Sequence, residues 1–160
     1  MKSDAVILDA CCGSRMIWFD KYNPSTIYMD SRELDCTLQD GRPLHIHPDV
    51  IGDFRNMPFE DGRFKMVVFD PPHLLSLGED SWLAKKYGRL SDTWKDDLKQ
   101  GFDECMRVLQ HEGILILKWS ERDISISALL DVLGTQPLFG SRRSTGIGPV
   151  WLVWMKGVGQ

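Results

Sequence analysis

The sequence contains no long apolar run. No stretch approaches the roughly 20 apolar residues that a membrane-spanning helix requires. Near the start of the chain, the apolar run 6–8 ends at Asp9, so it is too short for a secretory signal peptide. The chain is therefore expected to be cytoplasmic and to have no membrane partner.

The sequence also lacks an excess of basic residues. It has 19 Lys and Arg against 23 Asp and Glu, a formal net charge of −4 and a pI of about 5.5. Proteins that bind nucleic acid unaided usually carry an obvious basic excess. Tight unaided binding to bulk DNA or RNA is therefore disfavoured, although a local basic patch can coexist with an acidic total.

No C-x-x-C pair occurs among the four cysteines, and Cys11 and Cys12 are adjacent, a spacing that rarely forms a disulfide. Reduced thiols in a reducing compartment fit this pattern best. His45 and His47 could join a thiol on zinc, but four well-spaced ligands are not evident. No metal site is predicted, and the two histidines are expected to lie in a polar loop.

Internal repeats and low-complexity segments are absent, and the length is that of one ordinary domain. The 160 residues, 42% hydrophobic and 26% charged, are typical of a globular protein. A chain of this size buries roughly 70% of the surface that its unfolded form exposes. We expect one domain over residues 1–160, with no separate target-recognition domain.

Short apolar runs bounded by turn residues predict buried strands. Their lack of polar alternation is typical of parallel strands in a sheet covered on both faces. The runs are 6–8, 26–29, 50–51, 66–69, 114–117 and 150–155.

Helices are predicted between these strands. Apolar residues recur three and four apart over 91–110, where Ser91 or Asp92 can cap the start and Gly113 lies past the end. Residues 124–133 and 15–22 are expected to form two shorter helices, the former ending at Gly134. This alternation predicts an α/β doubly wound, mostly parallel sheet. The segment 137–156 differs, because a Gly-rich turn joins its two predicted strands into an antiparallel hairpin.

Four of the apolar runs lead into an aspartate: Asp9, Asp30, Asp53 and Asp70. In an open parallel sheet, ligands bind beyond the carboxyl ends of the strands, so four such acids would form one acidic rim. Alternatively, each aspartate caps the loop or helix that follows it. Their occurrence at four successive ends favours a shared site.

A G-x-G-x-x-G loop is missing after the first predicted strand, where Gly13 stands alone, so a nicotinamide dinucleotide fold is disfavoured. Four segments in order instead resemble the motifs of class I (Rossmann-like) S-adenosylmethionine-dependent methyltransferases. They are 7–15, 28–32, 52–59 and 67–73. The resemblance implies a seven-stranded sheet with a C-terminal antiparallel hairpin, and S-adenosylmethionine as cofactor.

The resemblance also implies roles for the residues in these segments. Asp30, with Ser31, would accept hydrogen bonds from the ribose hydroxyls, and Asp53, with the Phe54 amide, would hold the adenine. Arg15 stands where a family glycine is common and would either narrow the pocket or contact the cofactor carboxylate. The full set of implied cofactor residues is Asp9, Ala10, Cys11, Cys12, Gly13, Asp30, Ser31, Asp53, Phe54 and Asp70.

The segment Asp70-Pro71-Pro72-His73 is similar to the (D/N)-P-P-(aromatic) motif of bacterial and phage enzymes that methylate planar amino groups such as that of adenine. The Asp70 carboxylate and the Pro71 carbonyl could accept the two N–H groups of the amine. Pro71 and Pro72 have fixed φ angles and hold a rigid turn. His73 could stack on a flat substrate or take up a proton. A Pro-Cys dipeptide is absent, which argues against thiolate-type methylation of a ring carbon.

The substrate is expected to be DNA or RNA, with adenine as the target base. Aromatic and basic residues alternate between 74 and 90, as in a nucleic-acid contact, although a lid with solvated charges would share this pattern. A specificity subunit or a homodimer could complete such a small enzyme. The alternatives are a methyltransferase for a small molecule or a protein glutamine, and a non-catalytic cofactor-binding scaffold. The candidate substrate-binding residues are Trp82, Lys85, Lys86, Arg89, Arg142 and Arg143.

Overall fold

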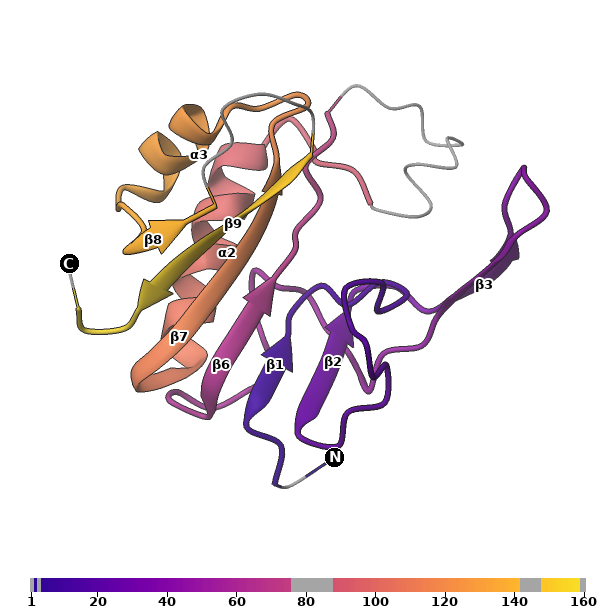
Figure 1. Cartoon of the computed structure of the whole chain (residues 1–160), viewed down its shortest axis with the longest axis horizontal. Helices are drawn as coiled ribbons and strands as arrows, with labels where there is room; N and C mark the ends of the chain where they lie inside the picture. The colour runs from indigo at the N-terminus through magenta and orange to yellow at the C-terminus, as the bar shows by residue number, and fades with distance from the viewer. Residues whose placement is uncertain (1, 3, 76–87, 142–147, 159–160) are drawn as a thin grey trace.

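The computed structural model describes residues 2, 4–75, 88–141 and 148–158. Its main sheet has seven strands in the order β5-β2-β1-β6-β7-β9-β8 (Figure 1). The strands are β1 (Ile7–Asp9), β2 (Thr26–Asp30), β5 (Val50–Ile51), β6 (Phe64–Phe69), β7 (Leu109–Ser120), β8 (Phe139–Gly140) and β9 (Pro149–Met155).

Five neighbouring strands are parallel. β1 lies between β2 and β6, β5 pairs with the outer side of β2, and β7 pairs with β6. The carboxyl ends of β1, β2 and β6 therefore meet at one edge of the sheet, as their arrowheads show in Figure 1. β9 runs antiparallel to both β7 and β8, which confirms the predicted C-terminal hairpin.

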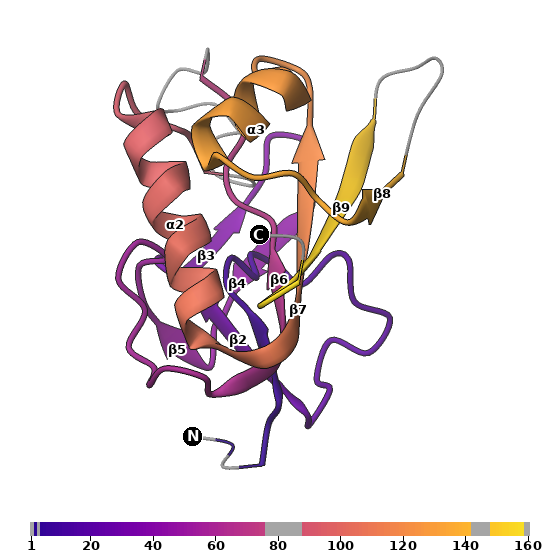
Figure 2. The same cartoon turned by 90° about the vertical axis from the view of Figure 1, so that its left-hand side faces the viewer.

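Helices α2 (Trp94–Val108) and α3 (Ile126–Leu133) pack on the same face of the sheet (Figure 2). Their apolar stripes bury Phe102 and Leu129 against buried strand residues such as Leu115 and Trp154. Ser125 caps the start of α3, since its hydroxyl accepts from the Ala128 amide. α3 ends at Gly134, as predicted. None of the helices in the described part of the chain is long and apolar enough to span a membrane.

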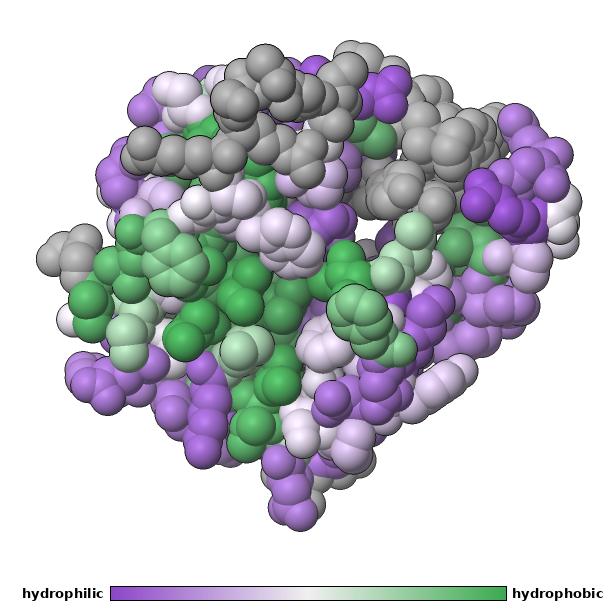
Figure 3. Space-filling view, viewed as in Figure 1, coloured by the Kyte–Doolittle hydropathy of each residue, from purple (hydrophilic) through white to green (hydrophobic). Residues whose placement is uncertain are grey.

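The opposite face of the sheet is also apolar, but it is only partly covered. Neighbouring strands place Met66, Ile114 and Met155 side by side on this face, and next to them Ile116 and Val153. Each of the five is partly exposed. Figure 3, drawn in the view of Figure 1, shows the resulting apolar surface.

Residues 15–22, predicted to be a helix, form a series of turns instead. Arg15 has a positive φ of 56°, which an α-helix does not tolerate. Its guanidinium donates to the carbonyls of Lys21 and His47 at 2.7 and 2.6 Å, and it lies 3.9 Å from the centre of the Tyr28 ring. This side chain therefore stabilises an irregular loop.

The long helix predicted over 91–110 is present, but its ends differ by two or three residues. It begins after Thr93 and ends at Val108, because β7 starts directly at Leu109. Gly113 lies past its end, as predicted, but within β7. The prediction of a polar loop for His45 and His47 is wrong for His45, which lies in β4 (Pro43–Ile46). This strand pairs with β3 (Leu34–Thr37) in a second, two-stranded sheet that projects from the main sheet in Figure 1.

Candidate active site

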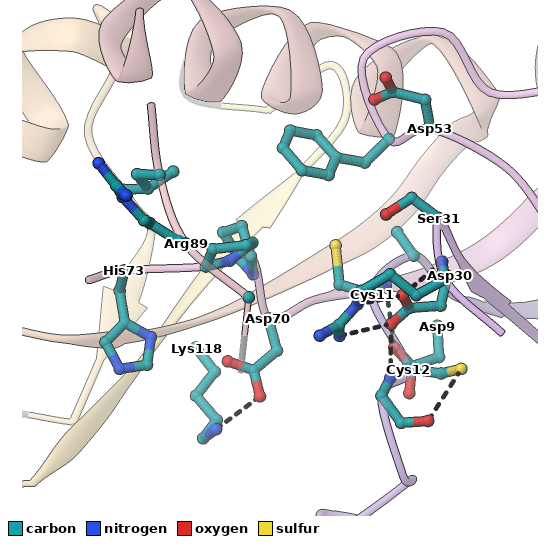
Figure 4. Close-up of a pocket in the computed structure, with 18 of the residues that line it drawn as sticks. Asp9, Cys11, Cys12, Asp30, Ser31, Asp53, Asp70, His73, Arg89 and Lys118 are labelled. Carbon is teal, nitrogen blue, oxygen red and sulfur yellow. Dashed lines mark hydrogen bonds and ion pairs between the residues drawn. The ribbon is translucent and has the colours of Figure 1, made fainter. Parts of the chain in front are cut away.

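The carboxyl ends of the parallel strands surround a cavity of about 580 Å³ (Figure 4). Asp9 ends β1, Asp30 ends β2, Asp53 follows β5 and Asp70 follows β6. All four aspartates line this one cavity. They come together because parallel strands present their carboxyl ends at the same edge of the sheet.

Asp9 lines the cavity and is 1% exposed. Its Oδ2 accepts from the Trp18 indole N–H at 2.6 Å, and its Oδ1 accepts from the Cys11 amide at 3.3 Å. Burial, helped by the nearby Asp70 and Asp30 carboxylates, raises the pKa of Asp9 to about 7 despite these two donors. Asp9 therefore changes its charge near neutral pH.

The loop after β1 is joined to the end of β2. The Gly13 amide donates to Asp30 Oδ2 at 2.9 Å, and the Cys12 amide donates to the Met29 carbonyl at 2.8 Å. Gly13 has a φ of 48°, which favours glycine, and a Cβ built on it would have no atom within 4 Å. A ligand in the cavity can therefore approach the backbone of this loop. Burial raises the pKa of the Cys11 thiol well above its usual range, so the thiol stays neutral.

Asp30 is 4% exposed, and hydrogen bonds surround its carboxylate. Besides the Gly13 amide, the Arg32 amide and Nε donate to Oδ1 at 3.0 Å each, and Arg32 Nη2 donates to Oδ2 at 3.3 Å. A carboxylate offers about four acceptor positions. A ribose diol would therefore have to replace the Arg32 guanidinium.

Asp53 repeats this arrangement at the far side of the cavity in Figure 4. The Arg55 amide and Nε donate to Asp53 Oδ1 at 2.9 and 3.0 Å, and Arg55 also pairs with Asp97 on α2. The Arg55 guanidinium holds the pKa of Asp53 below its usual value. Next in the sequence, the Phe54 ring lines the cavity and packs edge-on against Phe69, with ring centres 5.4 Å apart.

Asp70 is held by a lysine from the next strand. Lys118 on β7 places its Nζ 2.5 Å from Asp70 Oδ2, and both side chains are about four-fifths buried. Within the part of the chain that the structure describes, Asp70 Oδ1 has no hydrogen-bond partner. The ion pair thus fixes the carboxylate and leaves one oxygen able to accept an N–H from a ligand.

Pro71, Pro72 and His73 follow and line the same cavity. The His73 ring lies edge-on to Trp119, with ring centres 6.1 Å apart. Burial lowers the pKa of His73 below its usual value, Asp70 and the Pro71 carbonyl oppose this, and Lys118 reinforces it. His73 is therefore neutral at pH 7 and able to accept a proton.

The remaining predicted residues are divided between the cavity and other regions. Ala10, Ser31 and Arg89 line the cavity. Arg15 does not line it and so does not narrow it; Arg15 lines a second cavity. Trp82, Lys85, Lys86, Arg142 and Arg143 lie outside the described residues.

Several residues of the site were not predicted from the sequence. Lys118 could have been predicted, because it is a charged residue within the apolar part of β7. It follows Leu117, which pairs with Phe69, the residue before Asp70. Arg32 and Arg55 share an Asp-x-Arg spacing with the two acids that they pair with. Trp18 and Asp97 carry no local signal, because only the folded chain brings them to the site.

Comparison with solved structures identifies the architecture. An S-adenosylmethionine-dependent methyltransferase of Methanosarcina mazei is similar over 98% of this chain and 94% of its own, with 12% identity and a TM-score of 0.57. The N-methyltransferase NodS of Bradyrhizobium japonicum matches 95% of this chain and 85% of its own, with 11% identity and a TM-score of 0.55. An rRNA methylase of Streptococcus thermophilus matches 96% and 88%, with 10% identity and a TM-score of 0.56.

The chain has the class I methyltransferase fold. The expected fold class is thereby confirmed. No protein-family model matches the sequence, and no curated protein does. Sequence identities this low establish similarity of fold alone. The cofactor, the reaction and the acceptor must therefore be inferred from the chemistry of the cavity.

Proposed function

We propose that this protein is an S-adenosylmethionine-dependent methyltransferase acting on an exocyclic amino nitrogen, that of adenine in DNA or RNA. The observation that carries the proposal is a single cavity with two chemically different ends. Asp30 and Asp53 line one part, whereas Asp70 and His73 line another (Figure 4).

The cavity suits the cofactor in volume and in the shape of its lining. Its volume of about 580 Å³ lies within the range of small-molecule sites. The open space at Gly13 admits the amino-acid end of the cofactor. Asp30 would bind the ribose once Arg32 is displaced, and Asp53 with Phe54 would hold the adenine. The bound cofactor supplies an activated methyl group.

Asp70 would position the acceptor amine. Its Oδ1 would accept one N–H, and the Pro71 carbonyl, which has two lone pairs, would accept the other while it interacts with His73. These acceptors favour a nitrogen whose lone pair points toward the methyl donor. Most of the rate advantage comes from this alignment.

His73 would take up the proton that the nitrogen loses when it gains the methyl group. A neutral imidazole is required for this step, and the burial of His73 favours that form at pH 7. The His73→Gln variant is therefore expected to lower kcat more than it weakens cofactor binding.

The nucleic-acid substrate is supported by the motif at Asp70 and by Arg89, an exposed cation at the cavity. The structural neighbours leave the acceptor open, since one is named an N-methyltransferase and another an rRNA methylase. Because the net charge is −4, we expect a structured or single-stranded site, or a specificity subunit or second copy that supplies further contacts.

The test is transfer of radiolabelled methyl from S-adenosylmethionine to DNA and RNA oligonucleotides that contain or lack adenine. Asp70→Asn removes the charged acceptor, and Asp131→Asn, an exposed aspartate of α3, is the matched control. Label is expected in adenine-containing strands, lost in Asp70→Asn and kept in the control.

Two results would overturn the proposal in different ways. Label in a small metabolite or a protein glutamine, with none in nucleic acid, would refute the acceptor. Cofactor binding by calorimetry without transfer to any acceptor would instead support a cofactor-binding scaffold.

A further inference from the structure

The hairpin of β3 and β4 presents on one face three side chains of types that can ligate a metal ion. Asp35 on β3 pairs directly with His45 on β4, so their side chains share a face. His47 follows two residues after His45 and lies on that face as well. The other face holds the small apolar cluster Leu38, Leu44 and Ile46. The strand period therefore separates a polar ligand face from an apolar one.

The nitrogen atoms of both histidines converge on one carboxylate oxygen. His45 Nδ1 lies 2.5 Å and His47 Nε2 3.0 Å from Asp35 Oδ1. The two imidazoles are stacked, with ring centres 6.1 Å apart and 17° between their planes. One ligand atom from each of the three residues lies within 4.8 Å of the others. The ligand atoms around a tetrahedral zinc ion lie about 3.4 Å from one another, a separation below this 4.8 Å limit.

From this arrangement we infer that Asp35, His45 and His47 bind one divalent transition-metal ion of the zinc type. Two imidazoles and one carboxylate match the preferences of zinc, whereas magnesium and calcium prefer oxygen ligands alone. Three protein ligands leave a fourth tetrahedral position for water or an anionic oxygen. All three residues are exposed, so the ion enters from solvent.

The surroundings of the three residues suit a bound cation. Glu33 lies two residues before Asp35, and its Oε1 is 3.8 Å from His47 Nδ1. This second carboxylate would orient the His47 ring, as carboxylates do behind metal-bound histidines. His45 and His47 also line a second cavity of about 380 Å³, which shares Gly13 with the candidate active site. The metal would therefore sit beside the cofactor site, outside the methyl-transfer chemistry.

The test is calorimetric titration of the tag-free protein with Zn²⁺, with Mg²⁺ as the contrasting ion. The wild type is expected to bind one zinc ion and no magnesium. Asp35→Asn and His47→Ala are each expected to weaken zinc binding at least tenfold. Asp40→Asn in the same hairpin and His111→Ala on β7 are the matched controls. Circular dichroism of each variant establishes that the fold is intact.

Cobalt(II) substitution identifies the ligands independently of affinity. Visible bands of tetrahedral cobalt, without a thiolate charge-transfer band, are expected for the nitrogen and oxygen set. A charge-transfer band that disappears in Cys36→Ser would overturn the assignment, because Cys36 lies on the opposite face of the hairpin. Absence of zinc binding, or equal affinity in Asp35→Asn, would show that the histidines only hydrogen-bond to Asp35. Neither readout depends on methyl transfer.

Discussion

Ionisation of Asp9 is expected to control the pH dependence of stability. The carboxyl is 1% exposed, and its pKa is about 7 in the folded chain against 3.8 for an ordinary aspartate. The folded state therefore prefers the protonated form. The contribution of the protonated Asp9 carboxyl to the stability of the fold is fully present below pH 3.8 and is lost as the pH rises through about 7.

The difference in pKa sets the size of this effect. A shift of 1 unit corresponds to about 1.4 kcal/mol, so a rise from 3.8 to about 7 corresponds to about 4 kcal/mol. Asp9→Asn removes the titration but keeps a polar side chain of the same shape. It loses one acceptor for Trp18 or Cys11, which changes stability by an amount that does not vary with pH.

The assay is urea unfolding of wild type and Asp9→Asn between pH 4 and 8. The stability of the variant relative to wild type should increase by about 4 kcal/mol as the pH rises from 4 to about 7, and level off above that. Asp131→Asn, which alters an exposed aspartate, should follow the wild-type profile. A difference between wild type and Asp9→Asn that stays constant with pH would refute the reasoning.

Three further predictions concern the cavity. Asp30→Ala should weaken S-adenosylmethionine binding at least tenfold in calorimetry, whereas Arg32→Ala should bind as tightly as wild type or more so, because it removes a competitor for the same oxygens; equal losses in both would contradict this. Lys118→Met should lower kcat by about 10–100-fold, the value of a charge-assisted hydrogen bond, with an unchanged Kd for the cofactor. Gly101→Ala should lower the free energy of unfolding by about 1–3 kcal/mol in urea unfolding and weaken cofactor binding, because the new Cβ would lie 2.5 Å from Phe54 Cδ2. An unchanged cofactor affinity would count against a role for the Phe54 ring in cofactor binding.

Most of the strands could be predicted from local sequence. Runs such as 66–69 and 114–117 are apolar and end at turn residues, and both are strands in the structure. The same logic fails for 15–22, where the contacts of Arg15 with Lys21 and His47 decide the conformation. It also fails for β3 and β4, whose short amphipathic strands depend on pairing with each other.

The sequence by itself determined most strand segments of the main sheet and the four aspartates at or just after their ends. Strand periodicity and turn residues are local properties, so they can be read along the chain. Only the tertiary structure decided which distant partners reach these acids: Trp18 on Asp9, the Gly13 amide on Asp30 and Lys118 on Asp70. Charge state and free acceptor atoms depend on burial and on partners from other elements, and these arise only when the sheet assembles.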